Sequence, residues 1–158
     1  MDKNVKICMI SSLPPPIGGI SRWTEMILEK SEIDPDVEID ILNISPKGRP
    51  IGSNVLLRIT LGGLQLIKDI IKFISKIIKK QDLVHINSSG SLSIVRDIIL
   101  IIISTIFKVQ IVYHVHHGQF DQKIIFFVRV FVIVLSKIAR RIIELNSKTY
   151  CNIKSLII

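Results

Sequence analysis

Short apolar runs rich in isoleucine and valine alternate along this chain with longer segments of helical periodicity. The strand-like runs are Val5–Ser11, Val37–Ile44, Leu83–Asn87, Val109–Val115 and Arg141–Leu145. Helical spacing begins after Gly18–Gly19, with Ser21 placed to cap that helix, and recurs over Leu56–Lys80, Leu92–Phe107 and Gln122–Ala139. Such alternation is typical of a mostly parallel sheet with helices on both faces. We therefore expect an α/β fold, a single Rossmann-like domain over residues 1–158.

Length and composition agree with a packed domain. The chain has 158 residues, 48% of them hydrophobic, which is enough to bury a substantial core. Its net charge of +8 favours anionic partners. No helix-turn-helix, zinc-finger or RNP-type signature accompanies that charge, so we do not expect a nucleic-acid partner. Charge and apolar content together leave an anionic membrane surface as a further partner.

The apolar stretches are too short to predict a membrane span. Ile98–Phe107 and the interrupted run Ile124–Leu135 both fall well below the roughly 20 residues that a spanning helix needs. The first apolar run ends in three prolines and makes a poor signal peptide, and two cysteines, Cys8 and Cys151, do not form a disulfide framework. We expect a cytoplasmic protein, with peripheral attachment at the inner membrane face as a further expectation.

A glycine pair follows the first predicted strand. Gly18 and Gly19 come after the prolines Pro14–Pro16 and directly precede a helix. Glycine lets the backbone approach a ligand closely, and the first N–H groups of a helix attract anions. The pair therefore fits a phosphate contact, although the spacing is neither a dinucleotide fingerprint nor a P-loop. A tight turn after a proline-rich loop explains the same residues.

Hydroxyl and amide side chains follow the third strand-like run. Ser88 and Ser89 lie where that strand should end, and such groups suit hydrogen bonds to a sugar or another polyol. Turns and caps use the same residue types, so the segment is weak by itself. His85, inside the strand, is interpreted as a hydrogen-bonded core histidine.

Three histidines cluster at the end of the fourth strand-like run. Strand alternation places His114 and His116 on one face, and His117 lies where the strand should turn into a loop. Imidazole both donates and accepts hydrogen bonds near neutral pH. A zinc site would need a third ligand, but neither His85 nor Asp121 stands at a recognised spacing, so no metal is expected.

These three segments, in this order, resemble the amino-terminal domain of retaining glycosyltransferases with two facing Rossmann-like domains, the family-4 type with a GT-B fold. The most specific pieces are Pro15–Ser21, Asp82–Ser89 and Ile111–Gly118, and the resemblance covers essentially the whole chain. It implies that the chain is the acceptor-side half of a GT-B fold, without the carboxyl-terminal domain that holds most of the nucleotide sugar.

The resemblance also assigns roles to residues. It implies that Gly18 and Gly19 approach the donor diphosphate or an acceptor phosphate, and that Ser88 and Ser89 help to form the acceptor side. A family histidine beside the donor sugar is matched best by His116. His117 stands where many relatives have glycine, so it is the second candidate for the same catalytic position.

The reaction implied is transfer of a sugar from a nucleotide sugar to a hydroxyl of a glycan or lipid-linked acceptor, with retention, as in polysaccharide biosynthesis. The nucleotide sugar is a co-substrate, and no other cofactor is implied. We expect the chain alone to be inactive and to need a carboxyl-terminal partner chain or domain. The main alternative is a non-catalytic acceptor-binding or membrane-anchoring subunit of a split transferase. A metal-dependent hydrolase built on the histidines and a decayed remnant are further alternatives.

Overall fold

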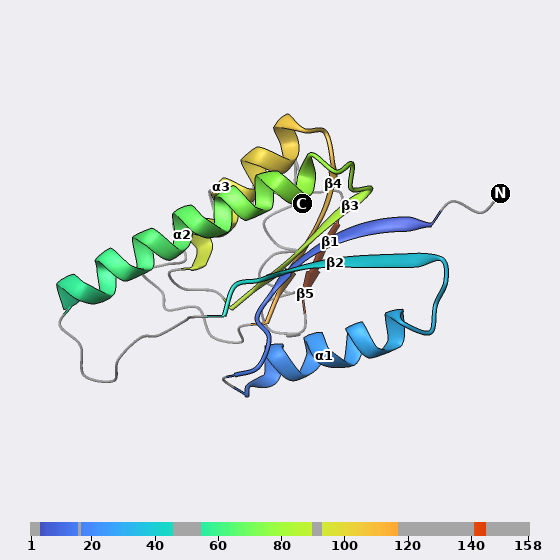
Figure 1. Cartoon of the computed structure of the whole chain (residues 1–158), viewed down its shortest axis with the longest axis horizontal. Helices are drawn as coiled ribbons and strands as arrows, with labels where there is room; N and C mark the ends of the chain where they lie inside the picture. Colours follow the sequence, from blue (N-terminus) through green and yellow to red (C-terminus); the bar gives the residue numbers. More distant parts are fainter. Residues whose placement is uncertain (1–3, 16, 46–54, 90–92, 117–140, 145–158) are drawn as a thin grey trace, which may run out of the picture.

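The computed structural model describes residues 4–15, 17–45, 55–89, 93–116 and 141–144. Its strands are β1 (Val5–Ser11), β2 (Val37–Asn43), β3 (Leu83–Ser88), β4 (Gln110–Val115) and β5 (Arg141–Glu144). Its helices are α1 (Gly19–Ser31), α2 (Val55–Ile77) and α3 (Ser93–Ile106). The strands form one sheet in the order β2-β1-β3-β4-β5, and every pair is parallel (Figure 1).

The α/β, Rossmann-like fold expected from the sequence is therefore confirmed. Most described elements begin and end within one or two residues of their predicted bounds. The second helix is an exception: it ends at Ile77, three residues before Lys80, which adopts the left-handed conformation with φ 60°. The predicted helix over Gln122–Ala139 lies outside the described residues.

The direction of the chain explains how the helices are distributed. From β1 the chain moves to one side to form β2, then returns past β1 to form β3 and continues to β4. Right-handed crossovers in opposite directions place their helices on opposite faces of the sheet. Accordingly α1 covers one face, while α2 and α3 lie next to each other on the other face (Figure 1).

The apolar core lies between the sheet and the α2–α3 layer. Strand alternation sends every second side chain toward these helices. The buried residues of this core include Cys8, Ile10, Val84, Ile86, Ile111, Phe73, Ile77, Leu100 and Ile101. Cys8 is a free thiol whose pKa is raised to about 12 by burial, so it stays protonated at neutral pH.

β2 lies at one edge of the sheet and is tied to α2 by charge. Its Asp40 forms an ion pair with Lys76 of α2. Across the residues that the structure describes, no helix is both long and apolar enough to cross a membrane.

Phe73 is fully buried against the sheet, whereas Ile71 on the same helix is 59% exposed. We expect Phe73→Ala to lower the free energy of unfolding by about 3–5 kcal/mol, because the cavity left behind adds to the lost burial. Ile71→Ala is the matched control and should change it by less than about 0.5 kcal/mol. Urea denaturation measures both, and equal losses at the two positions would contradict the packing described.

Candidate functional site

The carboxyl ends of all described strands meet at one edge of the sheet, because all are parallel. At β1 and β3, which are neighbours, the following helices leave toward opposite faces. Ligands of open α/β sheets bind at such a reversal point, outside the carboxyl ends of the strands. The described site residues at the ends of β1, β3 and β4, which are Gly18, Gly19, Ser88, Ser89 and His116, therefore belong to the same edge.

Gly18 and Gly19 form the start of α1. Gly18 is the N-cap residue, in extended conformation with φ −155° and ψ 173°, which any residue can adopt. A Cβ added at Gly18 would meet Ser21 Oγ at 3.9 Å, and one added at Gly19 would meet nothing within 4 Å. Neither the packing nor the backbone conformation of the chain therefore requires glycine here.

The sequence predicted that Ser21 would cap this helix, but Ser21 is not the N-cap residue. It is the third helical residue, and its hydroxyl accepts a hydrogen bond from the N–H of Gly18 at 2.8 Å and donates to the Gly18 carbonyl at 3.0 Å. The reason is that the helix begins at Gly19, three residues before Arg22, where it would begin if Ser21 were the N-cap. The N–H of Gly18 is thus satisfied within the chain, and the N–H of Arg22 donates to the Gly18 carbonyl at 3.0 Å. The N–H groups of Gly19 and Ile20 precede the first carbonyl that the helix could offer them.

The two serines after β3 have different surroundings. Ser88 is fully buried and its hydroxyl donates to Asp97 Oδ2 at 2.5 Å, so it faces the α2–α3 side of the sheet. Its carbonyl oxygen accepts the N–H of His116 at 3.0 Å, which joins the ends of β3 and β4. Ser89 is exposed and its hydroxyl lies 3.4 Å from that of Ser93. Of the pair predicted for the acceptor side, Ser89 is the one at the surface.

Asp97 is a buried carboxylate that was not predicted as a site residue. It is fully buried on α3, and Arg96 donates to its Oδ1 at 2.7 Å while Tyr113 donates to its Oδ2 at 3.2 Å. Burial raises the pKa of Asp97, and the nearby Arg96 and the hydrogen bond from Ser88 oppose that rise. The sequence feature that could have indicated it is a single acidic residue within an otherwise apolar helical segment. This network fixes α3 to the ends of β3 and β4.

A second polar group lies on the opposite face of the sheet, under α1. The ring of Trp23 packs edge-on against His85, His114 and His116, with centroid separations of 5.8, 4.9 and 5.3 Å. His114 and His116 are 4.1 Å apart, and His85 stacks on His114 at 5.7 Å. The prediction that His114 and His116 share a face is confirmed. The sequence does not indicate the position of Trp23 over the histidines, because an apolar residue at helical spacing fits any helix that covers a sheet.

Several polar atoms of this group have no hydrogen-bond partner among the described residues. They are His85 Nε2, His114 Nε2 and Asn87 Nδ2. His85 therefore lacks, at Nε2, the hydrogen bond expected of a core histidine. Asn87 Oδ1 lies 3.4 Å from His116 Nε2. Buried polar atoms are normally satisfied, so unpartnered ones at a sheet edge mark a place where a polar ligand can bind.

Burial under Trp23 keeps the histidines neutral. Desolvation lowers the pKa of His85 to about 4, with further contributions from His114 and His116, and lowers the pKa of His116 to about 4. Desolvation also lowers the pKa of His114. At neutral pH these rings act as uncharged hydrogen-bonding groups, suited to hydroxyls rather than to anions.

The same histidines do not form a metal site with other described side chains. Within the described ranges, no three His, Cys, Asp or Glu side chains are placed to hold a metal ion. His117, the second candidate for the family histidine, and Asp121, considered as a metal ligand, both lie outside the described residues.

The histidines make stability depend on pH. The unfolded chain has histidine pKa values near 6.5, and the folded values of His85 and His116 are about 4, so acid favours the unfolded state. The stabilising effect is complete above about pH 6.5 and is lost as pH falls toward about 4, with a slope of up to about 1.4 kcal/mol per pH unit for His85. Urea denaturation between about pH 6.5 and about pH 5 measures this slope, and His85→Gln should reduce it. An NMR titration that gives His85 its ordinary pKa of 6.5 would contradict the prediction.

The different roles of the two serines can be separated by mutation. We expect Ser88→Ala to lower the free energy of unfolding by about 1–3 kcal/mol, because buried Asp97 loses a donor. Ser89→Ala is the matched control and should stay within about 0.5 kcal/mol of the wild type. If Ser88→Ala were as stable as Ser89→Ala in urea denaturation, the described hydrogen bond would not contribute to the fold.

Comparison with known protein families gives no matching family profile, and comparison with curated protein sequences gives no match. Among solved structures, the chain is similar to the crystal structure of a conserved protein from Enterococcus faecalis V583, with 11% sequence identity and a TM-score of 0.42. The superposition covers 96% of this chain and 98% of that chain. A likeness at this level assigns neither a family nor a function.

Proposed function

We propose that this chain is the acceptor-side domain of a retaining glycosyltransferase of the two-domain type. The observation that carries the proposal is the position of Trp23, one turn after Gly19, whose ring contacts that of His116 at 5.3 Å. This contact joins the first turn of α1 to the end of β4. The hydrogen bond from the His116 N–H to the Ser88 carbonyl joins the end of β4 to the end of β3. Three segments distant in sequence thus meet around one edge.

The glycine pair is suited to a phosphate group. The first N–H groups of α1 carry the positive end of the helix dipole, and they attract anions. The open space at the Cβ position of Gly19 allows a ligand to reach the backbone. Since the fold itself gives no reason for glycine at either position, close approach of a diphosphate is the explanation that we favour for the pair.

His116 is suited to orienting a sugar. Its backbone is held by Ser88, its Nε2 lies near Asn87 Oδ1, and its lowered pKa keeps the ring uncharged at neutral pH. A neutral imidazole forms hydrogen bonds with sugar hydroxyls without attracting a competing anion. In the proposed reaction His116 positions the donor sugar and does not act as a nucleophile.

The reaction itself requires a second domain. The bond between the anomeric carbon and the donor phosphate breaks, the nucleoside diphosphate departs, and the acceptor oxygen bonds to the same face of that carbon. The acceptor proton passes to the departing phosphate oxygen. N–H donors aimed at the diphosphate stabilise its developing charge, which is electrostatic catalysis. Most of the contacts to the nucleotide would come from a carboxyl-terminal domain.

A second candidate is a non-catalytic subunit that binds the acceptor or attaches to a membrane. The exposed apolar side chains of α2 and α3 favour it. Mixing the chain with a separately supplied carboxyl-terminal domain and measuring sugar transfer separates the two candidates. Transfer that appears in the mixture and is lost in His116→Ala supports a catalytic domain, whereas transfer indifferent to His116 supports the subunit.

The glycine pair provides a direct test that needs no second domain. NMR titration with inorganic pyrophosphate should perturb the amides of Gly19 and Ile20 in the wild-type chain. Gly19→Val should weaken that binding about tenfold, because the added side chain blocks charge-assisted N–H contacts. Gly63→Val is the matched control, since a Cβ at Gly63 on α2 also meets nothing within 4 Å. Equal pyrophosphate binding by the two variants would contradict the phosphate role.

A further inference from the structure

Exposed apolar side chains are concentrated on the α2–α3 layer. Of the twelve large hydrophobic residues that are exposed in the described part of the chain, eight lie on these helices or directly after them. They are Leu64, Ile67, Ile71, Ile78, Val95, Ile102, Ile106 and Phe107. Contiguous exposed apolar surface on a soluble-type fold marks an interaction site.

The residues on α2 form one stripe. Leu64, Ile67 and Ile71 follow helical spacing, and Ile78 continues the same line two turns later. Their exposed fractions are 56, 56, 59 and 62%. Phe73 and Ile77, on the opposite side of the helix, are buried against the sheet. The core therefore uses one side of α2 and leaves a second apolar side to solvent.

Positive charge borders this stripe. Lys68 and Lys72 are exposed on the next face of the helix, and exposed Lys79 follows in the turn after Ile77. The one acid of α2, Asp69, is buried, as is Asp97 of α3, so the described residues of this layer expose lysines and no carboxylate. An apolar stripe beside a row of lysines complements a surface that is both apolar and anionic.

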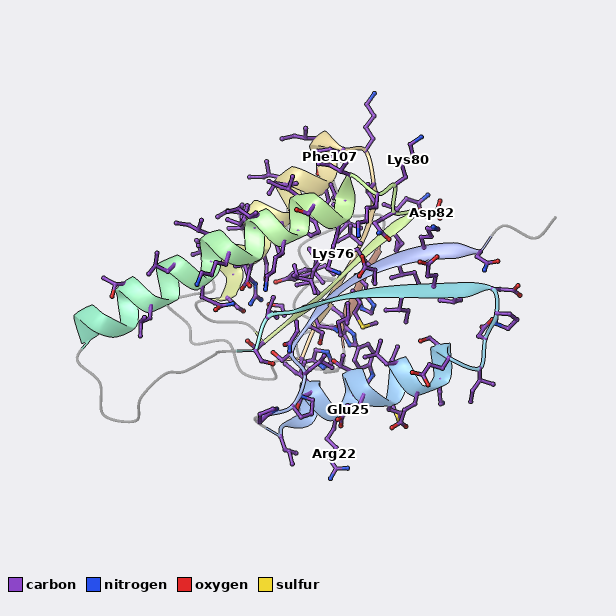
Figure 2. All side chains as sticks on the ribbon, in the orientation of Figure 1. Arg22, Glu25, Lys76, Lys80, Asp82 and Phe107 are labelled. Carbon is purple, nitrogen blue, oxygen red and sulfur yellow. The ribbon has the colours of Figure 1, made fainter. Side chains whose placement is uncertain are left out.

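The opposite side of the molecule is different. Arg22 and Glu25 both project outward from α1, while Lys80 and Phe107 lie at one end of the α2–α3 layer (Figure 2). α1 therefore mixes both signs of charge, which is typical of a solvated face. Exposed isoleucines beside lysines, without an exposed carboxylate among the described residues, are found on the α2 side.

We propose that the outward face of α2 docks on the surface of an anionic lipid bilayer. The isoleucine stripe would enter the boundary between headgroups and acyl chains, and the three lysines would contact lipid phosphates. No described helix can span a membrane, so the helix lies along the surface. This inference does not depend on the proposed reaction and holds for either candidate function.

Vesicle sedimentation tests the charge component. We expect the chain to sediment with vesicles of phosphatidylcholine and phosphatidylglycerol, and far less with phosphatidylcholine alone. Replacing Lys68, Lys72 and Lys79 by glutamine should lower the partition coefficient roughly a hundredfold, since each basic residue near an anionic surface contributes about fivefold. Lys30→Gln, an exposed lysine of α1, is the matched control and should bind like the wild type.

A tryptophan placed in the stripe tests the orientation. Ile71→Trp fluorescence should be quenched by brominated lipid, whereas Ile33→Trp, at a position 83% exposed just after α1, should not be. The native Trp23 gives a common background that is subtracted with the wild-type protein. Circular dichroism confirms that each variant is folded before it is used.

Three results would overturn the proposal. They are equal binding to neutral and anionic vesicles, equal quenching at positions 33 and 71, and an oligomer in light scattering that Ile71→Asp dissociates while vesicle binding is unchanged. The last result would show that a second copy of the chain covers the stripe.

Discussion

Parallel pairing of every described strand is the constraint on which the rest of the structure depends. It brings the carboxyl ends of β1, β3 and β4 to one edge, although the segments that follow them are far apart in sequence. Because the chain reverses direction around β1, α1 and the α2–α3 layer leave that edge on opposite faces. The edge is thereby lined from both sides, which is the geometry that makes such folds bind ligands there.

Buried polar groups on the two faces of the sheet differ in how fully they are hydrogen-bonded. Toward α2 and α3 the sheet is sealed by aliphatic side chains, and the buried Asp97 is tolerated because Arg96, Ser88 and Tyr113 satisfy it. Under α1 the histidines are desolvated by Trp23 without full hydrogen bonding. The first arrangement stabilises a rigid strand end. The second leaves unsatisfied polar atoms beside the edge, and that difference places the candidate site under α1.

The sequence predicted the elements well because isoleucine-rich runs and proline or glycine boundaries are local signals. It did not indicate that the hydroxyl of Ser88 is buried, since β3 continues one residue further than expected and alternation places Ser88 on the same face as Val84. Contacts between elements could not be predicted from the sequence. The packing of Trp23 on the histidines depends on strand order and register, which one sequence does not specify.

The lipid-docking surface and the candidate site lie on opposite faces of the sheet, the first on the outward side of α2 and the second under α1. α2 runs across one face of the sheet, and its first turns extend past the carboxyl edge (Figure 1). If the outward stripe of α2 rests on a bilayer, the sheet stands about one helix diameter, roughly 10 Å, above the lipid surface. Its carboxyl edge then opens parallel to the membrane plane, not away from it. A lipid-linked acceptor could extend its headgroup to that edge while its chains stay in the bilayer, so the two proposals require no conflicting orientation of the domain.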